Sequence, residues 1–345
     1  MSSMSNFTVG LAVIGGLVLA ILVAWNTWTS RRNTPRQPDT VPMPLQSEGT
    51  PAQERADPLF DAAETPLPVL DRRPVLDALI DVIAPVILEG HVSGDAALAA
   101  MPTTRRAGSK PFAIEGQNEA TGQWEPPHAG QRYIAFQAGV QLANRTGPLN
   151  EIEYSEFVMK AQAFADAING APEFPEMLDE VARGRELDQF ASEHDAQLGF
   201  TLRARNSAWS PGYVQQNAAR QGFVAGVIPG RMVLPGSVAG SPAVLGLSFD
   251  TQAAMADDPA QSAIREVTLS LDVPQVDRSE RPFVRMREAA IALAASMDGL
   301  ITDDDGEVIP ADSLDVIGAD LEHLYDTLDA HDLAAGSTLA RRLFS

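Results

Sequence analysis

Residues 266–273 read EVTLSLDV, in which Val, Leu, Leu and Val alternate with polar residues. Such alternation is typical of a β-strand that packs one face on a core and exposes the other to water. Residues 282–297, PFVRMREAAIALAASM, follow closely and have apolar residues at helical spacing, which predicts an amphipathic helix. Together the two segments favour an α+β fold in which helices cover one face of an antiparallel sheet.

Further elements of this kind surround the pair on both sides. The pattern predicts strands at 197–203, 231–234 and 243–249, a helix at 213–221 and a final helix at 311–327. Residues 299–309, GLITDDDGEVI, have the composition of a hairpin that turns at Asp305 and Gly306. We expect these elements to form one domain, over residues 191–335.

An earlier block, residues 74–190, has a similar order of elements. Strands are predicted at 82–88, 110–115 and 131–142, and helices at 94–101 and 150–168. We expect an α+β block that is a related, degenerate copy of the later domain. The alternative is that short α+β patterns look alike by chance, and the identities between the two blocks are few.

The N-terminus predicts a membrane anchor. The first thirty residues carry no charged side chain, and residues 7–28, FTVGLAVIGGLVLAILVAWNTW, are long and apolar enough to cross a bilayer as a helix. Arg31 and Arg32 follow directly, and basic residues after a span place the C-terminal part in the cytoplasm. A cleaved signal peptide has its basic residues before the apolar stretch. We therefore expect an uncleaved single-pass transmembrane helix, with residues 1–6 on the non-cytoplasmic side.

Residues 29–73 are rich in proline and poor in aromatic and β-branched residues. A segment of this composition does not bury enough apolar surface to offset the entropy of ordering the chain. Proline also favours extended conformations. We therefore expect a disordered linker between the membrane and the folded blocks.

The composition excludes several classes of function. With 25 Lys and Arg against 46 Asp and Glu, the formal charge is −21, so we expect no nucleic-acid partner. The chain has no cysteine, its five histidines are not paired at helical spacing, and it has no glycine-rich phosphate loop or nucleophile motif. We expect no metal, no cofactor, no small-molecule substrate and no catalytic residues, and hence not an enzyme.

The order of these features resembles the ZipA-like family of bacterial cell-division proteins, with a short neutral N-terminus, one span, a proline-rich linker and an α+β domain. The match is strongest over residues 195–333, and it depends on segments 196–202, 221–223, 242–247, 266–274 and 299–309. In that family the C-terminal domain binds the C-terminal tail of the tubulin-like protein FtsZ, in a shallow apolar groove on the open sheet face. The resemblance implies an adaptor that tethers the Z-ring to the bacterial inner membrane.

The resemblance also implies, by position, which residues line the groove: Gln197, Gly199, Ile228, Gly230, Gly246, Ser248, Thr268 and Ser270. Several of these residues are polar or small where better-known members of the family carry large apolar residues. The face then offers a peptide less apolar contact, or binding shifts toward Ile228, Met232 and Val244. Without the resemblance, an ordinary solvated sheet face is the simpler interpretation.

Two functions follow from the sequence. The first is a membrane-anchored cell-division adaptor that binds the FtsZ tail on its exposed sheet face. The second is a membrane-tethered peptide-binding module of the same fold with a different protein partner. The two differ in whether the open face keeps enough apolar surface to hold the tail.

Overall fold

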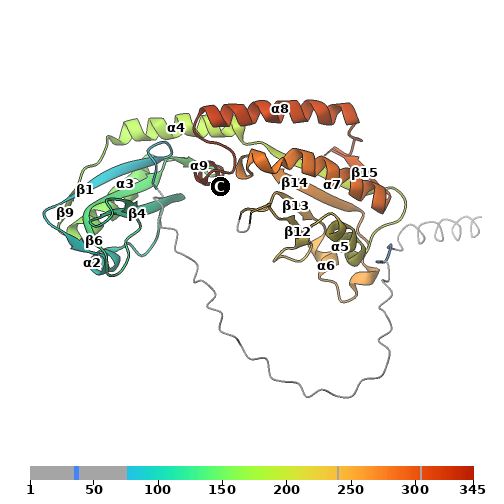
Figure 1. Cartoon of the computed structure of the whole chain (residues 1–345), viewed down its shortest axis with the longest axis horizontal. Helices are drawn as coiled ribbons and strands as arrows, with labels where there is room; N and C mark the ends of the chain where they lie inside the picture. Colours follow the sequence, from blue (N-terminus) through green and yellow to red (C-terminus); the bar gives the residue numbers. More distant parts are fainter. Residues whose placement is uncertain (1–34, 39–75, 239–240, 304) are drawn as a thin grey trace, which may run out of the picture. The chain divides into compact units, whose positions relative to one another are not determined.

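The computed structural model describes residues 35–38, 76–238, 241–303 and 305–345 (Figure 1). Among these residues, no helix is both long and apolar enough to cross a membrane. The predicted span at 7–28, the leading residues 1–6 and most of the predicted linker lie outside the described part of the chain.

The chain divides into two compact units. Unit 1 contains residues 196–337 together with the described segment 35–38, and unit 2 contains residues 76–195 and the C-terminal residues 338–345. Each unit combines helices with a sheet, and every strand pairing between named strands is antiparallel. The expected α+β class with antiparallel sheets is therefore confirmed for the described residues.

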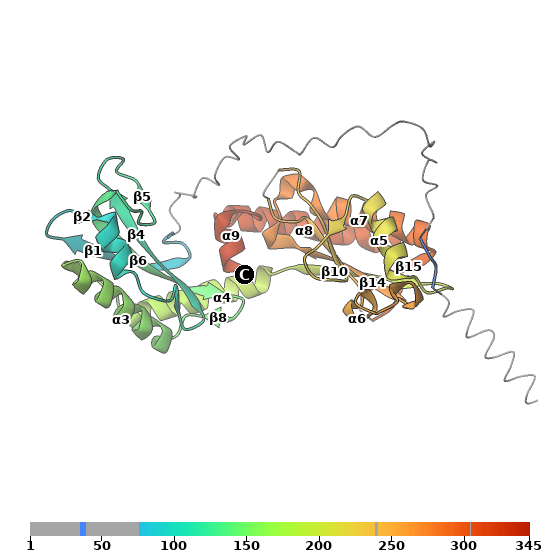
Figure 2. The same cartoon turned by 90° about the horizontal axis from the view of Figure 1, so that it is seen from below.

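Unit 1 is built on a six-stranded sheet with the order β11-β12-β13-β14-β10-β15. Its strands are β10 (Gln197–Ala204), β11 (Val224–Ala225), β12 (Arg231–Leu234), β13 (Leu245–Ser248), β14 (Glu266–Asp272) and β15 (Gly299–Thr302). Its helices are α5 (Pro211–Arg220), the short α6 (Thr251–Ala254), α7 (Pro282–Met297) and α8 (Ala311–Ala330). Short 3₁₀ turns lie at Pro259–Gln261, Val273–Gln275 and Arg278–Glu280. Figure 2 shows α5, α7 and α8 on the same side of strands β10 and β14.

The core of unit 1 lies between this sheet and its helices. On β14, Val267, Leu269 and Leu271 are at most 1% exposed, whereas the residues between them are partly or fully exposed. Leu269 pairs with Phe200 of β10 and Leu247 of β13, so apolar side chains meet across three strands. The Phe283 ring of α7 contacts the Phe200 ring at 6.3 Å between centroids. Helices α5, α7 and α8 therefore cover one face of the sheet, as the alternation predicts, and the residues of β10, β13 and β14 that point to the opposite face are partly or fully exposed.

Unit 2 has a main sheet of seven strands with the central order β3-β4-β6-β1-β9, to which β2 and β5 add at the edges. Its strands are β1 (Asp81–Leu88), β2 (Val92–Ser93), β3 (Arg106–Ala107), β4 (Lys110–Asn118), β5 (Trp124–Glu125), β6 (Arg132–Gln141) and β9 (Gly170–Pro172), with a separate pair β7 (Ala143–Asn144) and β8 (Gly147–Pro148). Its helices are α2 (Gly94–Ala100), α3 (Glu151–Ala167), α4 (Met177–His194) and the C-terminal α9 (Thr338–Leu343).

Helix α3 packs its buried face on the unit 2 sheet. It begins with a capping box, because the Asn150 side chain accepts bonds from the amides of Ile152 and Glu153 and the Glu153 carboxylate accepts one from the Asn150 amide. Further along the helix, Phe164 packs edge-on against Phe136 of β6, with ring centroids 5.3 Å apart. Both rings are fully buried. The sheet and α3 thus enclose an aromatic core of their own.

The two units share one topology. We set aside the two-residue strands β11 in unit 1 and β2 and β5 in unit 2, which leaves five strands in each sheet. When these five are numbered along the chain, their order across the sheet is 2-3-4-1-5 in both units. A helix follows the first strand in both units (α2 or α5), another follows the fourth (α3 or α7), and a third follows the fifth (α4 or α8). The similar order of elements seen in the sequence therefore has a counterpart in the strand order of the sheets.

Residues 35–38 differ from the expectation of a disordered linker over 29–73. They lie against unit 1, where Arg36 forms a parallel bridge with Trp209. The linker prediction is corrected at these four residues, because they have specific partners in the folded domain. Residues 39–73 are outside the described chain.

Candidate functional site

The face of the unit 1 sheet opposite α7 and α8 is the candidate binding surface, and we call it the open face. The strand register places Gly199 of β10, Ser270 of β14 and Gly246 of β13 side by side. The next row, on the same face, joins Thr268 and Ser248. Six of the ten residues expected in the groove share this face: Gln197, Gly199, Gly246, Ser248, Thr268 and Ser270.

Two of the expected residues are not on this face. Met232 pairs with Leu247 on the helix side of the sheet and is 5% exposed, so it belongs to the core. Val244 is 2% exposed and directly precedes β13. The assignment of both side chains to the groove is therefore corrected, because neither has surface to offer a partner.

The other two expected residues lie in the loop between β11 and β12. Gly230 is buried with φ of 78°, and a Cβ atom there would come within 2.8 Å of the Phe249 carbonyl oxygen. Its role is to allow the turn, since left-handed backbone combined with this close approach requires glycine. Ile228 is 50% exposed and remains available to a partner.

The floor of the open face is formed by small side chains. A Cβ atom on Gly246 would approach the Ser270 hydroxyl to 2.6 Å, so the glycine keeps the surface low at this point. Serine and threonine hydroxyls on either side can donate and accept hydrogen bonds. At one end of the face, Arg203 forms an ion pair with Glu266, with 3.1 Å between Nε and Oε1. The floor can therefore hold a peptide close to the sheet but offers it little apolar contact.

An apolar patch lies at the β11–β12 edge of the same sheet. Val224 and Val233 are paired across the two strands, and Val233 pairs in turn with Gly246 of the floor. Val224 is 49% exposed, and Val227 in the adjoining loop is fully exposed. Val224 and Val227 were not among the residues expected in the groove. The signal that could have identified them is the apolar run VAGVI at 224–228, which is unusual for a loop exposed to water. We call Val224, Val227, Ile228 and Val233 the edge patch.

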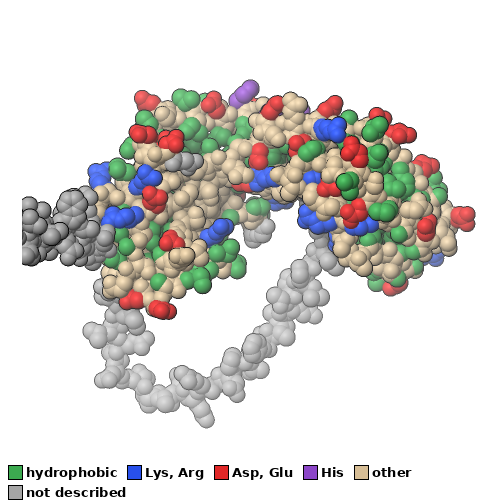
Figure 3. All heavy atoms as spheres, turned by 180° about the vertical axis from the view of Figure 1, so that it is seen from behind, with side chains coloured by type: hydrophobic (Ala, Val, Ile, Leu, Met, Phe, Trp, Pro, Cys, Tyr) green, Lys and Arg blue, Asp and Glu red, His purple; other side chains and the backbone are tan. Residues whose placement is uncertain are grey.

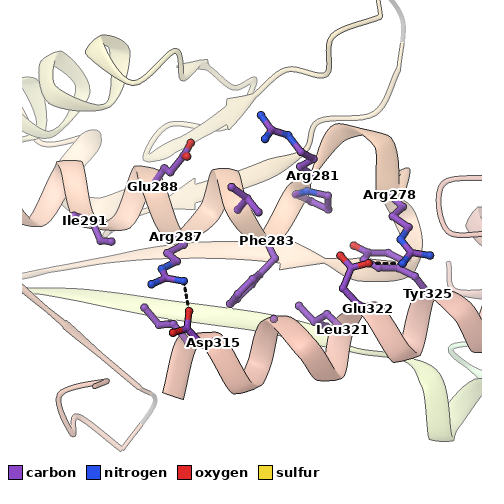
Figure 4. A pocket seen from close by; sticks show the side chains of 14 residues that line it. Arg278, Arg281, Phe283, Arg287, Glu288, Ile291, Asp315, Leu321, Glu322 and Tyr325 are labelled. Carbon is purple, nitrogen blue, oxygen red and sulfur yellow. Dashed lines mark hydrogen bonds and ion pairs between the residues drawn. The ribbon is translucent and has the colours of Figure 1, made fainter. Parts of the chain in front are cut away.

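A hollow of about 500 Å³ lies on the helical side of unit 1, between α7 and α8 (Figure 4). Phe283 and Leu321 line it, and the guanidinium of Arg278 bonds to Glu322 and Asp326 at one end. Burial raises the pKa of Tyr325 well above its ordinary range, so its hydroxyl stays neutral at physiological pH. Arg278 and Arg287 of this hollow form ion pairs with acids of the same unit, and we treat the hollow as part of the helix packing.

Charge is distributed broadly over the surface. On the side of the molecule that Figure 3 shows, acidic side chains are scattered over both units. Within residues 35–38, 76–238, 241–303 and 305–345, no three His, Asp or Glu side chains are grouped so that they could hold a metal ion. The open face with its edge patch is therefore the candidate site that we carry forward.

Comparison with known proteins adds no assignment. No protein-family model matches the chain, and no curated protein sequence matches it. The likeness to the ZipA-like family thus rests on the order and spacing of the sequence features. The structure contributes the strand register, which groups six of the expected residues on one face and removes Met232 and Val244 from it.

Proposed function

We propose that this chain is a membrane-anchored cell-division adaptor similar to the ZipA-like family, and that unit 1 binds the C-terminal tail of FtsZ. The observation that supports the proposal most is the open sheet face, whose low floor adjoins the exposed edge patch. A tail that lies across the floor can place its apolar side chains on this patch. The anchor predicted at residues 7–28 would then hold the bound polymer at the inner membrane.

The size of the patch indicates a weak contact. Burying a whole Val or Ile side chain contributes roughly 1.5–3 kcal/mol, and of the patch only Val227 is fully exposed, whereas Val224, Ile228 and Val233 are already partly buried. A gross gain of about 3–5 kcal/mol from the patch is reduced by the entropy that association costs, so the patch alone gives a dissociation constant of about a millimolar or weaker. Many adaptors on one membrane meet many tails on one polymer, and this multivalency makes a weak contact effective.

We propose that unit 2 is a related copy of unit 1. Its support is the common strand order of the two sheets, together with three helices in corresponding positions.

The polar floor of unit 1 favours one alternative, in which the same anchored module binds a protein partner other than the FtsZ tail. Both functions use the same face, and only the first one predicts that the FtsZ tail binds there.

Substituting Ile228→Asp or Gly246→Glu is expected to weaken binding of an FtsZ tail peptide at least tenfold. The first change puts a charge into the edge patch, and the second raises a long side chain from the floor. Fluorescence anisotropy of the labelled tail peptide, titrated with residues 35–345, measures the affinity. Val316→Asp is the matched control, because Val316 is 61% exposed on α8, away from the sheet.

The result separates the two functions. Binding of the tail by the parent protein that survives both substitutions would show that the face is not the site. No binding of the tail at millimolar protein would rule out the FtsZ function and leave the alternative partner. Circular dichroism of each variant verifies that unit 1 stays folded.

A further inference from the structure

The segment 35–38 is bound to unit 1 through its backbone. The amide of Arg36 donates to the Ala208 carbonyl at 2.8 Å, and the Arg36 carbonyl accepts a bond from the Ser210 amide at 3.0 Å. These two bonds make a parallel bridge to Trp209, which is fully buried. In Figure 1 the segment is the short blue stretch beside unit 1. The contact is thus made on both sides of one residue, as in a sheet.

The Arg36 side chain binds the C-terminal end of α7. Its guanidinium donates to the Met297 carbonyl at 3.2 Å and to the Asp298 carboxylate at 3.0 Å. The same Met297 carbonyl accepts a bond from the Trp209 indole at 2.8 Å. The last carbonyls of a helix carry partial negative charge, and Asp298 adds a full one, so this end of α7 is suited to a cation. Arginine fits it well because its several donors reach both oxygens at once.

The flanking residues extend the contact. Gln37 donates from its side-chain amide to the Ala260 carbonyl at 2.6 Å. Pro38 lies against Gly212, where a Cβ atom would be 3.1 Å from the proline Cγ. Pro35 is buried. Arg36, Gln37 and Pro38 therefore meet three different parts of unit 1, which distinguishes the contact from a single ion pair.

We propose that Trp209, Met297, Asp298 and Gly212 form an intramolecular binding site for segment 35–38, and that this site holds unit 1 next to the bilayer. The second half of the proposal rests on the anchor in the proposed function. Only residues 29–34 separate the predicted span from the bound segment. Six residues reach at most about 20 Å when extended.

Binding of segment 35–38 changes which parts of the chain the linker connects. Without it, unit 1 is joined to the predicted span only through residues 29–73 and the whole of unit 2. With it, unit 1 has a short direct connection, and residues 39–75 become the connection between unit 1 and unit 2. The short connection then keeps the candidate binding face of unit 1 close to the membrane.

Cross-linking tests the site without reference to membrane or tail. The chain has no cysteine, so Pro38→Cys and Gly212→Cys introduce its only two thiols, and a gel under non-reducing conditions separates the closed monomer from disulfide-linked dimers. In the full chain in detergent micelles, mild oxidation is expected to close this disulfide at least tenfold faster than a control pair, Pro38→Cys with Val316→Cys. Adding Arg36→Glu is expected to remove the difference. Equal rates for the two pairs, or rates unchanged by Arg36→Glu, would overturn the site.

Energy transfer tests the position of unit 1. A donor dye on Asp257→Cys, in the full chain in lipid nanodiscs with acceptor-labelled lipid, is expected to transfer efficiently, and Arg36→Glu is expected to reduce the transfer at least twofold. Arg231→Glu makes the same charge change elsewhere on unit 1 and should have no effect. Unchanged transfer in Arg36→Glu would overturn the positioning role. A protein that does not insert into the nanodisc would instead disprove the anchor, and the cross-linking result would remain valid on its own.

Discussion

Replacement of Leu269 by aspartate is expected to unfold unit 1. Leu269 is fully buried on β14, between Phe200 and Leu247 of the neighbouring strands. Losing its apolar burial costs about 2–3 kcal/mol, and placing a carboxyl group without a partner in the same core costs several more. Together these approach the whole stability of a typical domain, about 5–15 kcal/mol. Loss of the dispersed amide signals of unit 1 in an NMR spectrum would report the unfolding.

The adjacent residue provides the control. Ser270 is exposed on the opposite face of the same strand, so Ser270→Asp should leave unit 1 folded with nearly its original melting temperature. The contrast between two neighbouring positions depends only on the face to which each side chain points. A folded Leu269→Asp variant with an unchanged melting temperature would show that the helix layer does not seal this face.

The pair β14 and α7 is the part of the fold that the sequence predicted best. The strand expected at 266–273 is observed at Glu266–Asp272, and the helix expected at 282–297 has those bounds in the structure. In both segments the apolar residues follow the expected repeat over the whole element. They occupy every second position of the strand and recur at helical spacing over about four turns of the helix. A pattern of that length identifies both the type of element and its buried face.

Met232 on β12 shows where prediction from the sequence pattern fails. The strand is only four residues long, and its sequence RMVL has three consecutive apolar residues, so alternation cannot tell its two faces apart. The face of Met232 is decided by its pairing with Leu247 of the next strand. That register is a tertiary property, and it placed Met232 in the core rather than the groove.

The long-range contacts of two short segments, around Arg36 and at α9, could not be predicted from the sequence either. Composition alone favoured disorder around Arg36, because its partner Asp298 is 262 residues away and leaves no local signal. The last residues likewise carry no sign that α9 packs on unit 2, although unit 1 ends only at Ser337. Long-range partners of short segments are visible only once the fold is known.

The contact of α9 with β1 leads to the second large effect: Arg342→Ala is expected to destabilise unit 2 by about 3–5 kcal/mol at neutral pH. The Arg342 guanidinium donates two bonds to the Asp81 carboxylate, at 2.6 and 2.9 Å. Asp81 is fully buried, so removing the arginine leaves a buried acid without its cation. Hydrogen exchange in peptides from β1 and β6, followed by mass spectrometry, measures the stability of unit 2 in the full chain.

The loss is expected to depend on pH, with a sign fixed by Asp81. Burial raises the pKa of Asp81, and the bonds from Arg342 only partly oppose this effect. A carboxyl group with a raised folded-state pKa favours folding most below its ordinary pKa of about 4, and this contribution is lost as the pH rises through the raised value. Without Arg342 the pKa rises further, so the ionised acid is more costly at pH 7.5. The difference between parent and variant should therefore shrink as the pH falls toward 4.

A double variant separates the charge from the packing of α9. In Asp81→Asn with Arg342→Ala the buried acid is gone, so the part of the loss that varies between pH 7.5 and pH 4 should disappear. What remains is the lost contact of the arginine side chain, which is 17% exposed in the parent. A loss in Arg342→Ala that is the same at both pH values would mean that α9 is held by Leu343 and Phe344, which are buried, and that the ion pair contributes little. The expected pH dependence instead makes Arg342 the residue through which the end of the chain stabilises unit 2.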